Sequence, residues 1–161
     1  MRLNTRRLAS SVACLGLSAL MVGASFAQTD PQVGVWKLNV AKSKFSPGPA
    51  LKSATTTIEA AGKGTKVVVD QVTADGTKRH WEFTANYDGK DTPMTGNPDA
   101  DTVARTLINA RTVQTISKKG GKVLTTQTSE VSADGKTRTV TTKGVNASGQ
   151  QVNNVAVYEK Q

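Results

Sequence analysis

A histidine and a glutamate two residues apart are the side chains of this sequence best placed for acid–base chemistry. His80 is the only histidine, and on a β-strand it shares a face with Glu82, because alternate residues point to the same side. Such a pair can transfer protons, although on a solvent-facing strand it more often has no chemical role. No serine lies in a Gly-x-Ser-x-Gly motif, which marks one class of hydrolase nucleophile. We therefore expect no catalytic residues, no enzyme activity and no cofactor.

Metal ligands are equally sparse. The single Cys and single His exclude centres built from several cysteines or several histidines. The segment 97–101, Asn-Pro-Asp-Ala-Asp, alternates oxygen-bearing side chains as calcium loops do. However, it lacks the glycine at the sixth position and has Ile108 where the twelfth position needs an acidic residue. Asn and Asp also favour turns without any ion, so no metal site is predicted.

Aromatic side chains are the remaining candidates for a functional site. Trp81, Phe83 and Tyr87 share one face of a predicted strand at 78–87. Trp36 lies on the first predicted strand, and Tyr158 lies on the last. These five residues could stack against a ligand, and they could equally form a packed core, because aromatic residues at strand spacing usually do. They are the predicted ligand-binding residues.

The elements that must position them are short strands. Thr and Val are abundant and favour the pleated chain, and pairs such as Asp75-Gly76 and Asp134-Gly135 are typical of tight hairpin turns. No window has sustained helical periodicity. Strands are predicted near 33–40, 51–60, 65–73, 78–87, 102–108, 112–118, 122–132, 136–144 and 151–160.

The apolar faces of these strands are too poor for a thick sandwich core. An all-β fold, a single antiparallel up-and-down β-barrel of about 8–10 strands, accommodates such faces and leaves no bare edges. The irregular stretches 41–50 and 91–101 contain four of the five prolines. We expect both to be loops at a barrel mouth, where ligands usually enter.

The segment 72–79, VTADGTKR, is repeated 59 positions later as VSADGKTR at 131–138. Two hairpins could have converged on one favourable turn, or one hairpin could have been duplicated. Both interpretations stay open, and two copies are too few for a solenoid.

The first 27 residues have the composition of a secretory signal peptide. Three arginines precede an apolar stretch of 15 residues, Leu8–Val22, and small residues precede Gln28. So short a stretch cannot comfortably cross about 30 Å of hydrocarbon as a helix. We therefore predict a signal peptide at 1–27, a barrel domain at 28–161 and a periplasmic or secreted location. The exported chain would lose the only cysteine, which suits an oxidising compartment.

Charge bears on the choice of partner. Without the three arginines of the signal peptide, 18 basic residues face 12 acidic ones, a net charge of +6. The basic residues are spread along the chain, whereas nucleic-acid binding needs a continuous basic surface with exposed aromatic residues. We expect no nucleic-acid partner, no transmembrane segment, a weak attraction to anionic envelope surfaces and a monomer.

Two terminal motifs resemble those of the calycin barrels, the lipocalins and fatty-acid-binding proteins. Gly34-Val35-Trp36 resembles the Gly-x-Trp of the first lipocalin strand, and 155–160 resembles the last strand of fatty-acid-binding proteins, which carries Arg-x-Tyr. Tyr158 matches that tyrosine, but Ala156 stands where the ligand-binding arginine would be. The resemblance implies a barrel that holds a small molecule, with neutral or weakly polar ligands favoured over carboxylates.

Two functions follow from these patterns. The first is an exported barrel that binds an apolar or amphipathic small molecule in its lumen without catalysis. The second is a non-enzymatic envelope or interaction protein whose barrel is fully packed and holds no ligand.

The signal peptide is directly testable. We expect the exported protein to begin at Gln28, because the small residues at Ala27 and Ser25 suit signal peptidase. Intact-mass analysis of the exported pool measures this, and retention of residues 1–27 there would contradict the prediction.

Overall fold

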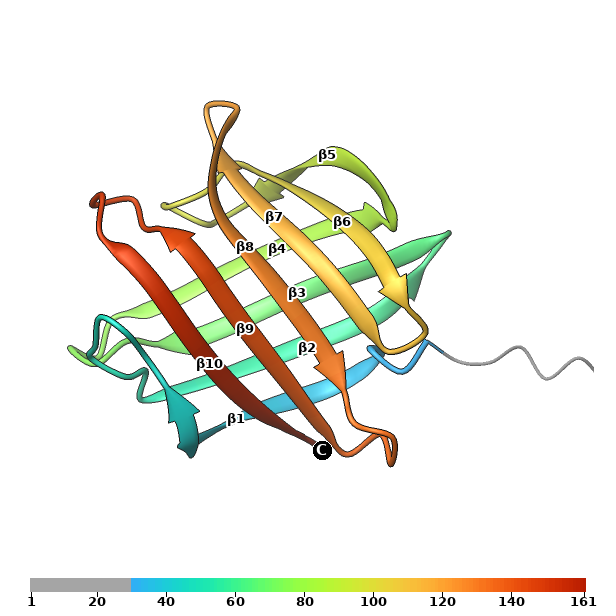
Figure 1. The fold of residues 1–161 in the computed structure, drawn as a ribbon, viewed down its shortest axis with the longest axis horizontal. Helices are drawn as coiled ribbons and strands as arrows, with labels where there is room; N and C mark the ends of the chain where they lie inside the picture. Colours follow the sequence, from blue (N-terminus) through green and yellow to red (C-terminus); the bar gives the residue numbers. More distant parts are fainter. Residues whose placement is uncertain (1–29) are drawn as a thin grey trace, which may run out of the picture.

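The chain forms a closed ten-stranded barrel (Figure 1). The computed structural model describes residues 30–161, so the predicted signal peptide lies outside the described residues. Each strand pairs antiparallel with the next, and the last pairs with the first, which confirms the predicted all-β up-and-down barrel. The strands are β1 Gly34–Lys44, β2 Ser53–Ala61, β3 Gly64–Val72, β4 Lys78–Asn86, β5 Asp88–Thr95, β6 Thr102–Asn109, β7 Thr112–Lys119, β8 Lys122–Val131, β9 Thr137–Val145 and β10 Gln151–Lys160.

One strand was not predicted. The stretch 91–101 was expected to be a loop, but residues 88–95 form β5, which includes Pro93. Proline is tolerated in a strand only where ladder hydrogen bonds are few. β5 meets this condition, because its pairing with β4 is confined to Glu82↔Thr95 and Phe83↔Met94. The first predicted loop also begins later than expected, since β1 runs to Lys44 with a register shift after Asn39.

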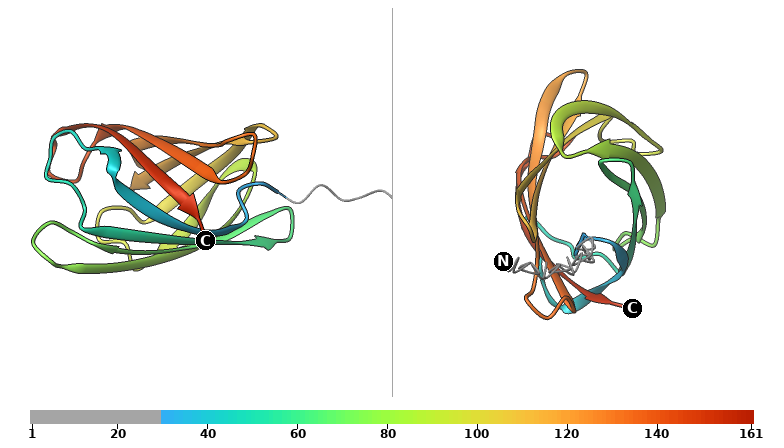
Figure 2. Two further views of the ribbon diagram at one scale, coloured as in Figure 1. Left: turned by 90° about the horizontal axis from the view of Figure 1, so that it is seen from below. Right: turned by 90° about the vertical axis from the view of Figure 1, so that its right-hand side faces the viewer.

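The strands surround one interior (Figure 2). The pairing register decides which side chains face it. Val69 lies opposite Trp81 and Val67 lies opposite Phe83, so β3 and β4 turn an apolar face inward. Two clusters form the core. One is built on Trp36, Ile58, Val67 and Val131, and the other on Leu38, Ala54, Val140 and Ala156.

The repeated segment forms the same turn twice, at opposite ends of the barrel. In each copy a hydroxyl three residues before the glycine, on Thr73 or Ser132, donates to the carboxylate of the following Asp. The backbone N–H two residues beyond that Asp donates to it as well, at 3.0 Å in both copies. Together with the hydroxyl of Thr77, these bonds lower the pKa of Asp75 to about 2. The repetition therefore marks shared turn chemistry.

A close approach of two strands explains one glycine. A Cβ at Gly64 would lie 2.5 Å from Asn86 Cα and closer still to the carbonyl oxygen of Ala85. No side chain fits there unless β3 and β4 separate.

We expect Gly64→Ala to lower the free energy of unfolding by about 1–3 kcal/mol, because overpacking forces the backbone to shift. Urea denaturation measures this. Gly48→Ala is the matched control, since its Cβ would lie 4.0 Å from the nearest atom, the carbonyl oxygen of Phe45. Equal transition midpoints for the two variants would contradict the prediction.

Candidate ligand-binding site

The barrel encloses a cavity of about 330 Å³ that is closed at one end and open at the other. At the open end its lining reaches the β1–β2, β5–β6 and β9–β10 connections, through Phe45, Asn97 and Asn146. At the closed end, where the chain enters at 30–33, Gln32 and Trp36 are completely buried. The cavity therefore has a single mouth, among the loops.

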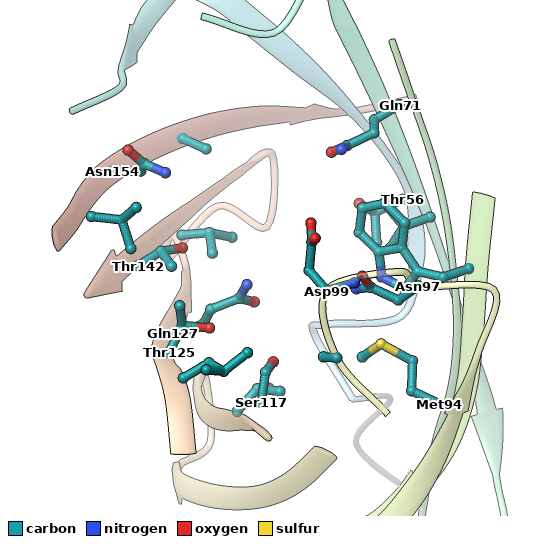
Figure 3. A pocket seen from close by; sticks show the side chains of 18 of the residues that line it. Thr56, Gln71, Met94, Asn97, Asp99, Ser117, Thr125, Gln127, Thr142 and Asn154 are labelled. Carbon is teal, nitrogen blue, oxygen red and sulfur yellow. Dashed lines mark hydrogen bonds between the residues drawn. The ribbon is translucent and has the colours of Figure 1, made fainter. Parts of the chain in front are cut away.

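Two opposite walls of the cavity differ in chemistry (Figure 3). The wall formed by β3, β4 and β5 is mainly apolar and aromatic, with Gln71 as its amide group. The wall formed by β7, β8 and β9 carries hydroxyl and amide groups beside Leu124, Val140 and Val145. The first wall contains Val67, Val69, Trp81, Phe83 and Met94, and the second contains Thr115, Ser117, Thr125, Gln127 and Thr142. A ligand with one apolar face and polar edges matches this lining.

Two arginines line the cavity. Arg105 on β6 is only 2% exposed. Its Nε donates to Thr115 Oγ1 at 3.3 Å, and its Nη1 donates to Thr65 Oγ1. The guanidinium carbon lies 5.0 Å from the centre of the Tyr87 ring, a favourable cation–π distance. Burial is the main cause that lowers the pKa of Arg105.

Arg138 on β9 lies opposite Tyr158 of β10 and is 8% exposed. Its Nε donates to Ser129 Oγ at 2.7 Å and to Gln32 Oε1 at 3.3 Å, and its guanidinium carbon is 5.6 Å from the Tyr158 ring centre. Burial lowers the pKa of Arg138 to about 10, and the like charge of Arg105 acts in the same direction. A pKa of about 10 leaves Arg138 cationic near neutral pH, and arginine side chains in general stay protonated in proteins.

A hydrogen-bond network seals the closed end beneath Arg138. Gln32 Nε2 donates to the carbonyls of Arg111 and Ser129, at 3.0 and 3.3 Å. Ser129 Oγ donates to Gln32 Oε1 at 2.9 Å, and Trp36 Nε1 donates to the Gln32 carbonyl at 2.8 Å. The segment before β1 is thereby tied to β6–β9 across the barrel.

The positive charge in the lumen is only partly balanced. Among residues 30–161, neither Arg105 nor Arg138 belongs to an ion pair. The nearest compensating charge is Asp30, which accepts a 2.5 Å hydrogen bond from Tyr87 Oη and acts on Arg105 through space. Asp99 also lines the cavity, where it is paired with Arg79, so the excess charge beside the two arginines is positive.

Three of the five predicted ligand-binding residues line the cavity, namely Trp81, Phe83 and Tyr158. The other two lie elsewhere. Trp36 packs in the first core cluster, and the Tyr87 hydroxyl is engaged with Asp30. The structure brings the first three together and places the other two at the closed end.

Sequence reasoning missed the two lumenal arginines. It considered an arginine only at position 156 and from its absence expected neutral ligands, whereas β6 and β9 supply guanidinium groups instead. Arg105 is two residues after Val103, and Arg138 is two residues before Val140. Each arginine therefore shares the inward face of its predicted strand with that valine. That alternation was the available signal.

The His80–Glu82 pair lies away from the cavity wall, whereas Asn97 and Asp99 of the calcium-like segment line the cavity. His80 is 59% exposed, and its Nδ1 lies 2.7 Å from Asp70 Oδ1, while Glu82 pairs with Lys66. In the 97–101 segment, Asp99 pairs with Arg79, and Asp101 accepts from the N–H of Gly120. Within residues 30–161, no three His, Cys, Asp or Glu side chains are grouped to hold a metal ion.

Comparison with known proteins identifies no family for this chain: no protein-family model matches it, and no curated protein matches its sequence. In the described part of the chain, no helix has the length and apolarity needed to cross a membrane.

We expect Ser129→Ala to lower the free energy of unfolding by about 1–3 kcal/mol, because it removes an acceptor of Arg138 and a donor to Gln32 in a buried network. Ser148→Ala, on the exposed β9–β10 turn, is the matched control and should have little effect. Chemical denaturation of both variants checks this, and equal stabilities would show that the network contributes nothing.

Proposed function

We propose that this protein is an exported, monomeric barrel that binds an amphipathic small molecule in its lumen and catalyses no reaction. The observation that carries the proposal is the cavity of about 330 Å³, open at one end and lined by both apolar and polar side chains. Ligand sites are typically concave, mostly apolar and supplied with a few placed polar groups.

The distribution of packing supports a ligand site. The core clusters are well buried near Trp36 and Leu38, but toward the mouth the inward positions carry Thr125, Thr142 and Asn154. Short polar side chains leave space that Leu or Phe would fill.

The absence of catalysis is proposed from the lining. Among the described residues that line the cavity there is no His, Cys or Lys, and the only carboxylate is Asp99, which is paired with Arg79. Such a lining lacks the adjacent nucleophile and base that covalent catalysis uses.

We expect Thr142→Trp to weaken binding of a neutral probe, N-phenyl-1-naphthylamine, by about tenfold or more, because a lumenal indole would occupy the cavity. Thr141→Trp is the matched control, because Thr141 is adjacent to Thr142 on β9 and its side chain therefore faces away from the lumen. Probe fluorescence gives the dissociation constants.

Wild-type protein that shows no saturable binding of this probe, or of anionic 8-anilinonaphthalene-1-sulfonate, would contradict the proposal. The packed interaction protein would then be the better interpretation. Equal effects of the two tryptophan substitutions would also contradict it, because binding would then lie outside the lumen.

A further inference from the structure

The two lumenal arginines are an unusual pair of buried charges. Buried charges are normally paired, because removal from water costs free energy that a partner must offset. Here the protein supplies hydroxyls, an amide oxygen and aromatic ring faces to Arg105 and Arg138, but no ion pair among residues 30–161.

Arg138 retains guanidinium donors that the side chains of residues 30–161 do not satisfy. Among the described residues, the side-chain hydrogen bonds of Arg138 all use Nε, which leaves both Nη atoms to be satisfied. No fully buried side-chain nitrogen or oxygen in residues 30–161 lacks a partner. The remaining Nη atoms are therefore exposed to the cavity, whose lining includes both arginines.

We propose that the lumen binds a compact aromatic carboxylate, with the carboxylate held by Arg105 and Arg138 and the ring lying against Trp81 and Phe83. This proposal rests on the proposed function and specifies the class of ligand that the same cavity takes.

The charge of the site favours a monoanion. Asp30 accepts a hydrogen bond from Tyr87 and acts on Arg105 through space, but it forms no ion pair with it, so positive charge remains for the ligand. A guanidinium presents donors in a planar fork that matches the two oxygens of a carboxylate. A phosphate ester would bring close to two charges at neutral pH and exceed the compensation available.

The shape and lining favour a ring over a long chain. A cavity of about 330 Å³ is at the small end of ligand sites. One wall carries Trp81 and Phe83, which offer ring faces for stacking. The facing wall carries Thr115, Gln127 and Thr142, whose hydroxyl and amide groups would stay unpaired against an alkyl chain, which costs free energy. A flat ring contacts the aromatic wall and leaves the polar wall hydrated.

Isothermal titration calorimetry with two isosteric ligands tests the charge requirement. We expect 2-naphthoate to bind the intact protein at least about tenfold more tightly than 2-naphthamide, which has the same shape without the charge. Arg105→Met and Arg138→Met should each weaken 2-naphthoate binding by about tenfold or more and change 2-naphthamide binding by less than about threefold.

Arg111→Met is the matched control, because it removes the same charge from an exposed hairpin residue and should leave both affinities unchanged. If one lumenal variant fails to fold, the wild-type comparison and the other variant still decide the outcome. Equal affinities of the wild type for the two ligands would overturn the proposal.

Two further ligands test the remaining parts of the assignment. Tighter binding of dodecanoate than of 2-naphthoate would overturn the aromatic class, and tighter binding of 2-naphthyl phosphate would overturn the carboxylate. These outcomes can be told apart from failure of the proposed function. In that case N-phenyl-1-naphthylamine and 8-anilinonaphthalene-1-sulfonate would also fail to bind.

Discussion

Closure of the barrel by pairing β1 with β10 is the constraint on which the other features depend. Trp36 lies opposite Lys160 and Leu38 lies opposite Tyr158 in this pair, and the Lys160 ammonium sits 5.1 Å from the centre of the Trp36 ring. Closure leaves no unpaired edge. It also brings the inward side chains of ten strands into one interior, so every polar group that points inward must find a partner there or face the cavity.

The two ends of the interior meet this requirement differently. At the closed end, Gln32, Ser129 and the Nε of Arg138 are joined by hydrogen bonds, and Trp36 Nε1 donates to the Gln32 carbonyl. Toward the mouth, hydroxyl and amide side chains remain open to the cavity. Arg105 and Arg138 stand at the transition, with part of each guanidinium bound by protein and part facing the lumen. The same side chains thus stabilise the fold and supply charge to the candidate site.

In two places the observed strand pairing differs from what the local sequence indicates. Pro93 and its neighbours indicate a loop, but the gap between β4 and β6 is closed by 88–95, and the few ladder bonds of β5 tolerate the proline. His80 and Glu82 share a strand face, but His80 contacts Asp70, which lies directly opposite on β3. Cross-strand neighbours on one face can be closer than alternate residues of one strand, so the neighbouring strand decided both outcomes.

The sequence by itself determined the fold class, because Thr- and Val-rich segments with period-two alternation and Asp-Gly turns favour hairpins locally. It also predicted an inward face for Trp81 and Phe83, which line the cavity. Only the tertiary structure decided that Trp36 is core and that Arg105 and Arg138, 33 residues apart in the chain, line one cavity without an ion-pair partner among residues 30–161. Strand alternation shows which face a side chain occupies. What lies opposite it depends on register and closure, which arise from pairings between distant parts of the chain.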